Sequence, residues 1–414
     1  MMTTPLHRWL SRVLGLCKKC LPDVSSGFFC VFRNRNQRRL FVKSMALLVT
    51  LVVLLSLTLV SPALAAPAGG AVDQALTWLK SQQNADGGFS NGFSPESNLA
   101  ATAEVVIALT ASGQDAGELR SAADASPLDH LYQQVQAGQV EGVGITAKVV
   151  LALVAAGVDP TNFAGRDLIG QIEADYDPDS GSYGGSIFDQ ALVVLALVNA
   201  GQAVPEGAAD YLMAHQTADG AWNFMGDTAA LTGDTNTTAL VVQALVATGY
   251  QNETGRAMDY LRRVQNADAG WPYQNPSAYG TETDANSTAL VLQAIYALGQ
   301  TPGDWYVDGS DPLGALLSLQ NASGSFSYQA SFPGDNVLAT VQAIPAAEGV
   351  TLVGVPIVPT GGAPGSAAAA PPATLPVAGD VLLPVVAILM LAGLSLVSLG
   401  QWLKRANSKL ANER

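Results

Sequence analysis

The chain has 414 residues, 49% of them hydrophobic, and a formal net charge of −14, so it is long enough to bury a sizeable core. Its charge is uneven, because residues 66–380 contain seven Lys and Arg against 32 Asp and Glu, a difference of −25. Such an acidic body repels nucleic acid and anionic lipid headgroups, which excludes both as partners for it.

The first 65 residues have the layout of a secretory signal peptide. A long basic region, residues 1–43, carries nine Lys and Arg and one acid, and an apolar stretch follows over residues 44–60. The small-residue triplet that ends at Ala65 is a cleavage site of the expected type. We therefore expect cleavage after Ala65 and export of the remainder, with an uncleaved N-terminal anchor as the alternative.

We expect no metal ion and no cofactor. All the cysteines lie in the signal segment, and the Cys17-x-x-Cys20 pair has no second Cys/His pair beside it, as a zinc site requires. An acidic run, Asp175, Asp177 and Asp179, has calcium-like spacing, but Ser180 and Ser186 stand where an EF-hand loop has Gly and Glu. An acidic turn is our interpretation, and calcium binding is the alternative. The three cysteines are Cys17, Cys20 and Cys30.

Residues 66–349 contain six copies of one helical hairpin. In the most complete copy, residues 257–298, an amphipathic helix with apolar residues at i, i+3, i+4 and i+7 comes first. A loop with Gly270 and Trp271 follows, and residues 288–298 then form a helix that is apolar except at Gln293. Such a hairpin cannot bury both faces alone, so it requires neighbours of the same kind.

A glycine ends the apolar helix of every copy and gives the register of the repeat. Successive glycines are 44, 44, 48, 50 and 50 residues apart. Each is expected at the C′ position of its helix with positive φ. These glycines are Gly113, Gly157, Gly201, Gly249, Gly299 and Gly349.

The pattern A-x-x-(W/Y)-L-x-x-x-Q, followed by a Gly-aromatic turn, resembles the repeat of squalene-hopene cyclases and of protein prenyltransferase β subunits. The resemblance covers residues 71–349. It implies an all-α fold, an α/α toroid in which six inner helices surround a central cavity and six outer helices surround them. The matching positions are Ala75/Trp78/Leu79/Gln83/Phe89, Ala208/Tyr211/Leu212/Gln216/Trp222, Ala257/Tyr260/Leu261/Gln265/Trp271 and, in part, Gln320/Gly324/Phe326.

The catalytic groups of these relatives are missing from this sequence. No D-x-D-D acid motif occurs, and the corresponding loops contain Asp234-Thr-Asn-Thr and Asp284-Ala-Asn-Ser. Prenyltransferases hold zinc with Asp, Cys and His, whereas this body has no Cys, and both its histidines, His130 and His215, fall on expected outer helices. The Cys-Gly-Glu-Gln of thioester proteins is also absent. Cobalamin carriers use a similar toroid without catalysis, but the β domain that covers their ligand is missing here.

Polar residues that precede the inner helices are the candidate ligand-binding residues. If the inner helices run parallel, these side chains surround one mouth of the toroid, where a ligand would enter. N-capping of the apolar helices is the alternative, and both roles are compatible. The candidates are Asn98, Asp234, Asn236, Asp284, Asn286 and Asp335.

The repeat aromatics could stack on a sugar or an isoprenoid, but their position favours packing between adjacent hairpins. This structural set comprises Trp78, Phe89, Tyr183, Trp222, Trp271 and Phe326.

The C-terminal part changes composition twice. Residues 350–380, rich in Pro, Gly and Ala, predict an extended linker. Residues 381–403 carry no charge and are long enough to span a bilayer, and the basic tail 404–414 places the C-terminus in the cytoplasm and the repeats outside. Residues Leu375 to Gly379 resemble a sortase signal with Ala378 in place of the usual Thr, so processing there is the alternative to a plain membrane anchor.

We therefore predict an exported, membrane-anchored α/α toroid that binds a small molecule or glycan without catalysis. A divergent cyclase or prenyltransferase-like enzyme, with Asp234 or Asp284 as general acid, is one alternative. A structural spacer with a filled ring is the other, and the volume of the central cavity separates it from the first two.

Overall fold

The computed structural model describes residues 68–358 and 360. The expected signal segment, apolar span, basic tail and sortase signal lie outside these residues, as does most of the linker. Within residues 68–358, no helix is both long and apolar enough to cross a membrane.

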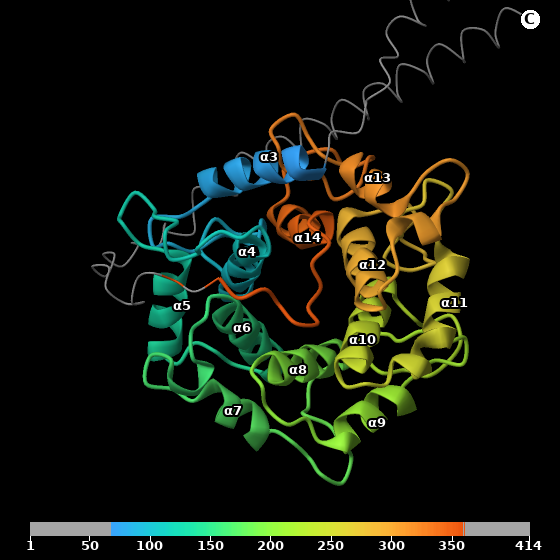
Figure 1. Cartoon of the computed structure of the whole chain (residues 1–414), viewed down its shortest axis with the longest axis horizontal. Coiled ribbons are helices and arrows are strands. Elements are labelled where there is room, and N and C mark those ends of the chain that lie inside the picture. Colours follow the sequence, from blue (N-terminus) through green and yellow to red (C-terminus); the bar gives the residue numbers. More distant parts are fainter. Residues whose placement is uncertain (1–67, 359, 361–414) are drawn as a thin grey trace, which may run out of the picture. The chain divides into compact units, whose positions relative to one another are not determined.

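Two concentric rings of α-helices make up the described part, and its regular elements are all helical (Figure 1). Inner and outer helices alternate along the chain, as the repeat predicts. The inner ring consists of α4 (Leu99–Ala111), α6 (Val143–Ala155), α8 (Ile187–Asn199), α10 (Thr235–Ala247), α12 (Ala285–Ala297) and α14 (Val337–Ala347). The outer ring consists of α3 (Ala68–Ser81), α5 (Pro127–Gln136), α7 (Leu168–Ala174), α9 (Glu206–Ala214), α11 (Gly255–Val264) and α13 (Pro312–Leu317). Short 3₁₀ turns, η1 (Pro160–Asn162), η2 (Gln251–Thr254) and η3 (Pro302–Trp305), lead into α7, α11 and α13.

Both rings are closed. The last inner helix, α14, packs against α4 and α3, the first helices of the two rings. In the outer layer, the Nε2 group of Gln320 donates a hydrogen bond of 2.7 Å to the carbonyl oxygen of Ala71, which joins the sixth repeat to the first. The toroid that the repeat pattern implies is therefore confirmed.

The helix-ending glycines occupy the expected conformation. All six have φ between 68° and 85°, a region that L side chains rarely adopt. The prediction that these glycines terminate the inner helices at C′ is confirmed.

Four of the aromatic loops share a hydrogen bond to a threonine that the sequence pattern did not reveal. The backbone N–H of Trp222 donates to the hydroxyl of Thr238 at 3.0 Å, and that of Trp271 donates to Thr288 at 3.1 Å. Both threonines lie four residues after the N-cap of the next inner helix, inside its first turn. The same bond recurs from Phe89 to Thr102 and from Phe326 to Thr340.

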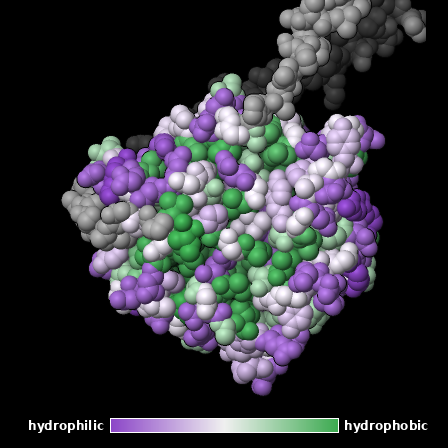
Figure 2. Space-filling view, in the orientation of Figure 1, coloured by the Kyte–Doolittle hydropathy of each residue, from purple (hydrophilic) through white to green (hydrophobic). Residues whose placement is uncertain are grey.

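The first residues of the expected linker belong to the toroid. Residues 350–358 cross the ends of the inner helices. The N–H of Leu352 donates to Gln243 Oε1 at 2.9 Å, and that of Val355 donates to Asn199 Oδ1 at 2.7 Å. In Figure 1 this segment passes over the centre of the inner ring, and Figure 2 shows apolar side chains gathered over the middle of the same view. The start of the expected linker, residues 350–358, thus packs against the toroid through polar partners that lie more than 100 residues away and that composition does not reveal.

Candidate functional site

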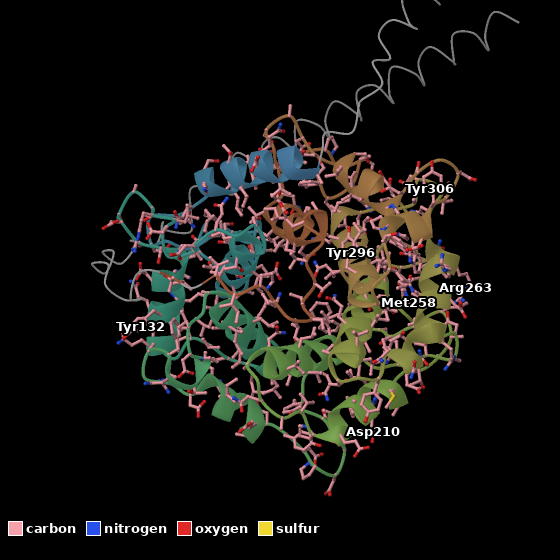
Figure 3. The ribbon with its side chains drawn as sticks, viewed as in Figure 1. Tyr132, Asp210, Met258, Arg263, Tyr296 and Tyr306 are labelled. Atoms are coloured by element: carbon pink, nitrogen blue, oxygen red, sulfur yellow. The ribbon has the colours of Figure 1, made fainter. Side chains whose placement is uncertain are left out.

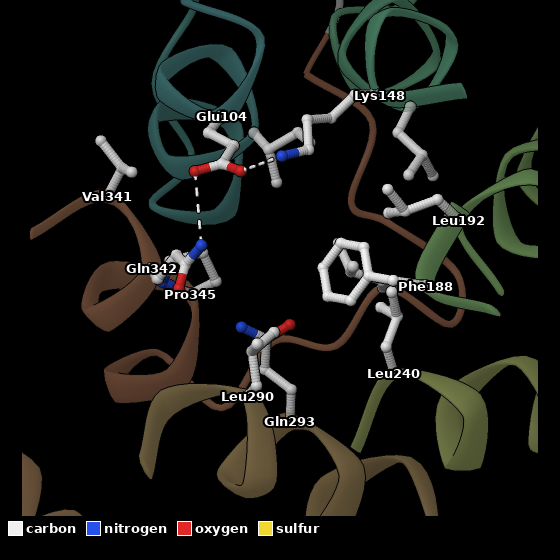
Figure 4. Close-up of a pocket in the computed structure, with 13 residues that line it drawn as sticks. Glu104, Lys148, Phe188, Leu192, Leu240, Leu290, Gln293, Val341, Gln342 and Pro345 are labelled. Carbon is white, nitrogen blue, oxygen red and sulfur yellow. Dashed lines mark hydrogen bonds and ion pairs between the residues drawn. The ribbon is translucent and has the colours of Figure 1, made fainter. Parts of the chain in front are cut away.

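The inner helices enclose a central cavity of about 60 Å³ (Figure 4). Most of its lining side chains lie two, six or nine residues after the N-caps, so the same face of each inner helix looks inward. Ligand pockets usually measure about 300–1,000 Å³. The cavity therefore cannot enclose a corrinoid or an isoprenoid chain, but it has room for one substituent of a ligand.

One side of the cavity is a chain of four polar side chains from four inner helices. The Nζ of Lys148 on α6 forms an ion pair with the Glu104 carboxylate on α4. The other carboxylate oxygen accepts a hydrogen bond of 3.5 Å from Gln342 Nε2 on α14, and Gln342 Oε1 accepts one of 2.8 Å from Asn286 Nδ2 on α12. The two charged side chains are only 13% and 20% exposed, and their charges cancel, so the cavity wall carries no net charge.

The opposite side of the cavity is apolar. Phe188, Leu192 and Leu240 project from α8 and α10 toward the polar chain (Figure 4). Leu352, from the segment that crosses the ring, also contributes to the lining. The result is a small amphipathic cavity that is open to a partner with one polar and one apolar side.

Three buried amide atoms of the inner helices have no hydrogen-bond partner among the described residues, and one of them belongs to Gln293, which lines the cavity. They are Asn236 Oδ1, Gln243 Nε2 and Gln293 Oε1. Gln243 and Gln293 are 0% and 3% exposed, so their amides are removed from bulk water. A buried polar atom without a partner costs about 1–3 kcal/mol, and this cost is what a bound ligand would recover.

Three of the predicted site residues are N-caps. Asn98 Oδ1 accepts from the N–H of Ala101, Asp234 Oδ1 from that of Thr237, and Asp284 Oδ1 from that of Ser287, at 2.7–3.0 Å. The capping interpretation is correct for these three.

The inner helices run parallel, because the first residues of three of them bond to equivalent loops of the following repeats. The N–H groups of Ile187, Thr235 and Ala285 donate to the carbonyls of Phe224, Tyr273 and Tyr328. Their N-termini therefore share one end of the ring, which we call the mouth.

Asp335 is not equivalent to the capping residues, because it is not the N-cap of α14. Asn336 caps α14, and its side chain accepts from the N–H of Ala339. Asp335 lies one residue earlier and accepts instead from Trp78 Nε1 at 3.2 Å and from two serine hydroxyls of the sixth loop. Thr340, whose hydroxyl accepts from the N–H of Phe326, lies four residues after Asn336 and so identifies Asn336 as the cap position of the sixth repeat.

Asn236 and Asn286 lie two residues after the caps, in the first turns of α10 and α12. Asn286 is the first member of the polar chain, and Asn236 carries one of the unpaired oxygens. None of the six candidates lines the central cavity, and Asn286 is connected to its lining through Gln342.

The capping aspartates do not offer a proton to the cavity. Burial raises the pKa of Asp284 to about 6 and also raises the pKa of Asp234. However, the two oxygens of Asp284 accept hydrogen bonds from the backbone and hydroxyl of Ser287, and those of Asp234 from Thr237 and from the N–H of Phe224. Both carboxyls therefore fix the first turn of a helix, which argues against them as the general acid of an enzyme.

The repeat aromatics are buried between hairpins. Trp222 Nε1 donates to the carbonyl of Leu212 at 2.6 Å, and Trp271 Nε1 donates to that of Leu261 at 2.8 Å, so each indole fastens its loop to its own outer helix. The buried set is Trp78, Phe89, Tyr183, Trp222, Trp271 and Phe326.

The acidic run of the third loop forms a turn. Asp177 accepts hydrogen bonds from the hydroxyl of Ser180 and the N–H of Asp179, and all three aspartates are on an exposed loop or at its edge. Across residues 68–358 and 360, no three His, Cys, Asp or Glu side chains are grouped so as to hold a metal ion.

Glu104 and Lys148 were missed by sequence reasoning, although a signal for them existed. They occupy the same place in the segments TAEVVIAL and TAKVVLAL, exactly one repeat of 44 residues apart. Two opposite charges at one register position of otherwise apolar inner helices predict an ion pair across adjacent helices.

No protein-family model matches the sequence, and no curated protein matches it either. Solved structures do resemble the fold. The type II terpene cyclase MstE from Scytonema, without ligand, aligns with a TM-score of 0.51 and 15% identity over 68% of this chain and 97% of the cyclase. An unsaturated glucuronyl hydrolase specific for heparin aligns with a TM-score of 0.50 and 10% identity over 68% of this chain and 96% of the hydrolase. At this identity the likeness shows the α/α toroid fold alone.

Proposed function

We propose that this protein is a binding protein of the cell surface that receives one uncharged polar group of a small ligand in its central cavity. The observation that carries the proposal is the unpaired Oε1 of Gln293, which lines the cavity, and Asn236 and Gln243 carry two further unpaired amide atoms on the inner helices. A spacer with a filled ring has no reason to keep such atoms away from water, because each of them costs stability.

The charges of the cavity favour a neutral group. Its one carboxylate, Glu104, is already paired with Lys148, so neither an ammonium nor a carboxylate of a ligand would find an unpaired opposite charge. The unpaired atoms comprise two acceptors and one donor. A hydroxyl or an amide, which both donates and accepts, satisfies such a set.

The cellular location in this proposal is the one that the sequence predicts. The expected signal segment 1–65 and the expected span 381–403 would hold the toroid outside the cell on a single membrane anchor, with residues 361–380 as its tether. Sortase processing at Leu375 to Gly379 would attach the same toroid to the cell wall instead.

Native mass spectrometry tests the proposal. The full-length protein would be purified in detergent from its own host and examined for mass that leaves on denaturation, beside the Gln293→Leu variant. We expect a retained small molecule in the natural protein and its loss from the variant. A natural protein that is empty and gains stability from Gln293→Leu would refute the binding function, because Gln293 would then be only an unpaired buried acceptor.

Catalysis is the second candidate, and one observation favours it. The Glu104 carboxylate and the Lys148 ammonium contact each other inside the cavity, where a proton could pass from one of them to a bound group. A retained molecule that is converted by the natural protein, and is left unchanged by Glu104→Gln, would establish the enzyme instead of the carrier.

A further inference from the structure

The loops at the mouth carry most of the exposed apolar side chains. Eight of the ten large hydrophobic side chains that are exposed in the described part lie in the loops that lead from outer to inner helices in the first, fourth, fifth and sixth repeats. These four repeats are consecutive around the closed ring. An exposed apolar set confined to one end of the molecule indicates an interaction site.

Three of these side chains are held at equivalent positions in the loops of the mouth. Phe224, Tyr273 and Tyr328 each lie two residues after a buried loop aromatic, and their carbonyls accept the first N–H of α8, α10 and α12 at 2.8–3.0 Å. Their exposed fractions are 46%, 44% and 36%. The ring of Phe224 lies 6.3 Å from that of Phe188, which lines the cavity. We call Phe188, Phe224, Tyr273 and Tyr328 the aromatic rim.

The charge of the mouth excludes anionic partners. The six connecting loops, residues 82–98, 137–142, 175–186, 215–234, 265–284 and 318–336, contain thirteen Asp and Glu and no Lys or Arg. Phosphate, sulfate and uronate groups would be repelled there. The partner is therefore neutral or cationic.

The charges that line the cavity favour a neutral partner over a cationic one. A basic side chain that entered it would meet Glu104 already paired with Lys148, whose ammonium repels a second cation. A neutral group instead meets the unpaired Oε1 of Gln293. Because the cavity holds only about 60 Å³, the bulk of the ligand must lie at the mouth, against the aromatic rim. Flat apolar rings beside amide groups suit a sugar ring, whose C–H face stacks while its hydroxyls form hydrogen bonds.

We infer that the ligand is a neutral glycan chain that the mouth holds by its end. This inference rests on the proposed binding function. The terminal unit directs one substituent, such as a hydroxymethyl or acetamido group, into the cavity toward Gln293, and the following units stack on Tyr273 and Tyr328. Burial and the Asp234 carboxylate, to which the Tyr273 hydroxyl hydrogen-bonds, raise the pKa of Tyr273 to about 12, so this hydroxyl is already engaged and Tyr273 offers its ring to the glycan.

Calorimetry on the full-length protein in detergent tests the inference. The probes are cello-, manno- and chito-oligosaccharides of one to six units, an oligogalacturonate, and a nona-arginine peptide. Three variants are compared with the natural protein: Tyr273→Ala with Tyr328→Ala, the same pair changed to Phe, and Tyr306→Ala. Tyr306 is the matched control, because it is 61% exposed but lies on the outer layer (Figure 3).

We expect one neutral series to bind with affinity that rises with chain length, and the oligogalacturonate to bind at least about tenfold more weakly. The double Ala variant should lose about tenfold or more, the Phe pair should retain most of the affinity, and Tyr306→Ala should match the natural protein. An unchanged Tm would show that the Ala pair remains folded.

The experiments distinguish a failure of the glycan inference from a failure of the proposed binding function. If native mass spectrometry finds a retained molecule but no oligosaccharide binds, or if binding ignores the two tyrosines, the glycan inference is wrong while the binding function stands. Rim-dependent binding of nona-arginine without oligosaccharide binding would overturn the inference in favour of a basic polypeptide. An empty protein that binds none of the probes would refute both proposals.

Discussion

The stability of the toroid should depend on the protonation of Asp284. Burial raises the pKa of this carboxyl from 3.8 to about 6 in the folded protein. An acid whose folded pKa is raised contributes stability that is fully present below its unfolded pKa and is lost as the pH rises through the folded value. At about 1.36 kcal/mol per pKa unit, the whole loss is about 3 kcal/mol, of which about 1 kcal/mol falls between pH 5 and pH 7.

Asp284→Asn isolates this contribution. The first and sixth repeats already have Asn98 and Asn336 at the equivalent cap, so an amide can cap an inner helix. Denaturant unfolding of the full-length protein at pH 5 and pH 7 gives the free energy of unfolding of both proteins. We expect the natural protein to lose about 1 kcal/mol more than the variant between these pH values. Asp167→Asn, at the exposed cap of α7, is the matched control.

Equal losses in the natural protein and in Asp284→Asn would refute this reasoning, because the buried cap would then not change its charge between pH 5 and pH 7. A loss in the Asp167→Asn control that is as small as in Asp284→Asn would equally refute it, since the effect would then not depend on burial.

Three further substitutions test other parts of the structure. Ala269 has φ of 70° where the other aromatic loops have Gly, so Ala269→Gly should stabilise the protein by about 0.5–1 kcal/mol and raise its Tm. Asn199 accepts from Val355 and donates to the carbonyl of Leu352, so Asn199→Ala should cost about 1–3 kcal/mol and speed hydrogen exchange in residues 350–358. Lys148→Met leaves Glu104 unpaired and should lower the free energy of unfolding by about 2–4 kcal/mol, a loss that the double variant with Glu104→Gln should largely restore. A Lys148→Met loss that persists in the double variant would show that packing, rather than the unpaired charge, is responsible.

The hairpins were predictable because their signals are local. The 3.6-residue period of an outer helix, the apolar run of an inner helix and Gly at C′ each depend on a few adjacent residues. The caps at Asn98, Asp234 and Asp284 follow from the same local chemistry. Resemblance was needed only for the closure of the ring, which depends on the contact of the last inner helix with the first.

The cavity was less predictable because its volume and its polar contacts depend on residues that lie far apart in the sequence. Gln342 interacts with Glu104 and Asn286, which lie 238 and 56 residues away in the sequence. The segment 350–358 looked like linker because its partners, Asn199 and Gln243, looked like ordinary inner-helix residues. The volume of the central cavity and the hydrogen-bond partners of the residues around it could therefore be learned only from the folded ring.

Some positions of the repeat are the same in nearly every hairpin, whereas others differ between hairpins. Positions that every hairpin needs are nearly constant around the ring, such as Gly at C′ and Asn, Asp or Ser at most inner caps. The position six residues after the cap varies instead: it is Leu in three consecutive inner helices and polar in the other three. The three leucines, Leu192, Leu240 and Leu290, show that this site accepts a simple apolar residue. The polar trio of Glu104, Lys148 and Gln342 loses solvation where leucine would pack without that cost, so a requirement of folding alone does not account for it. That asymmetry, polar on one side of the lumen and apolar on the other, is what a ligand with two unlike sides requires.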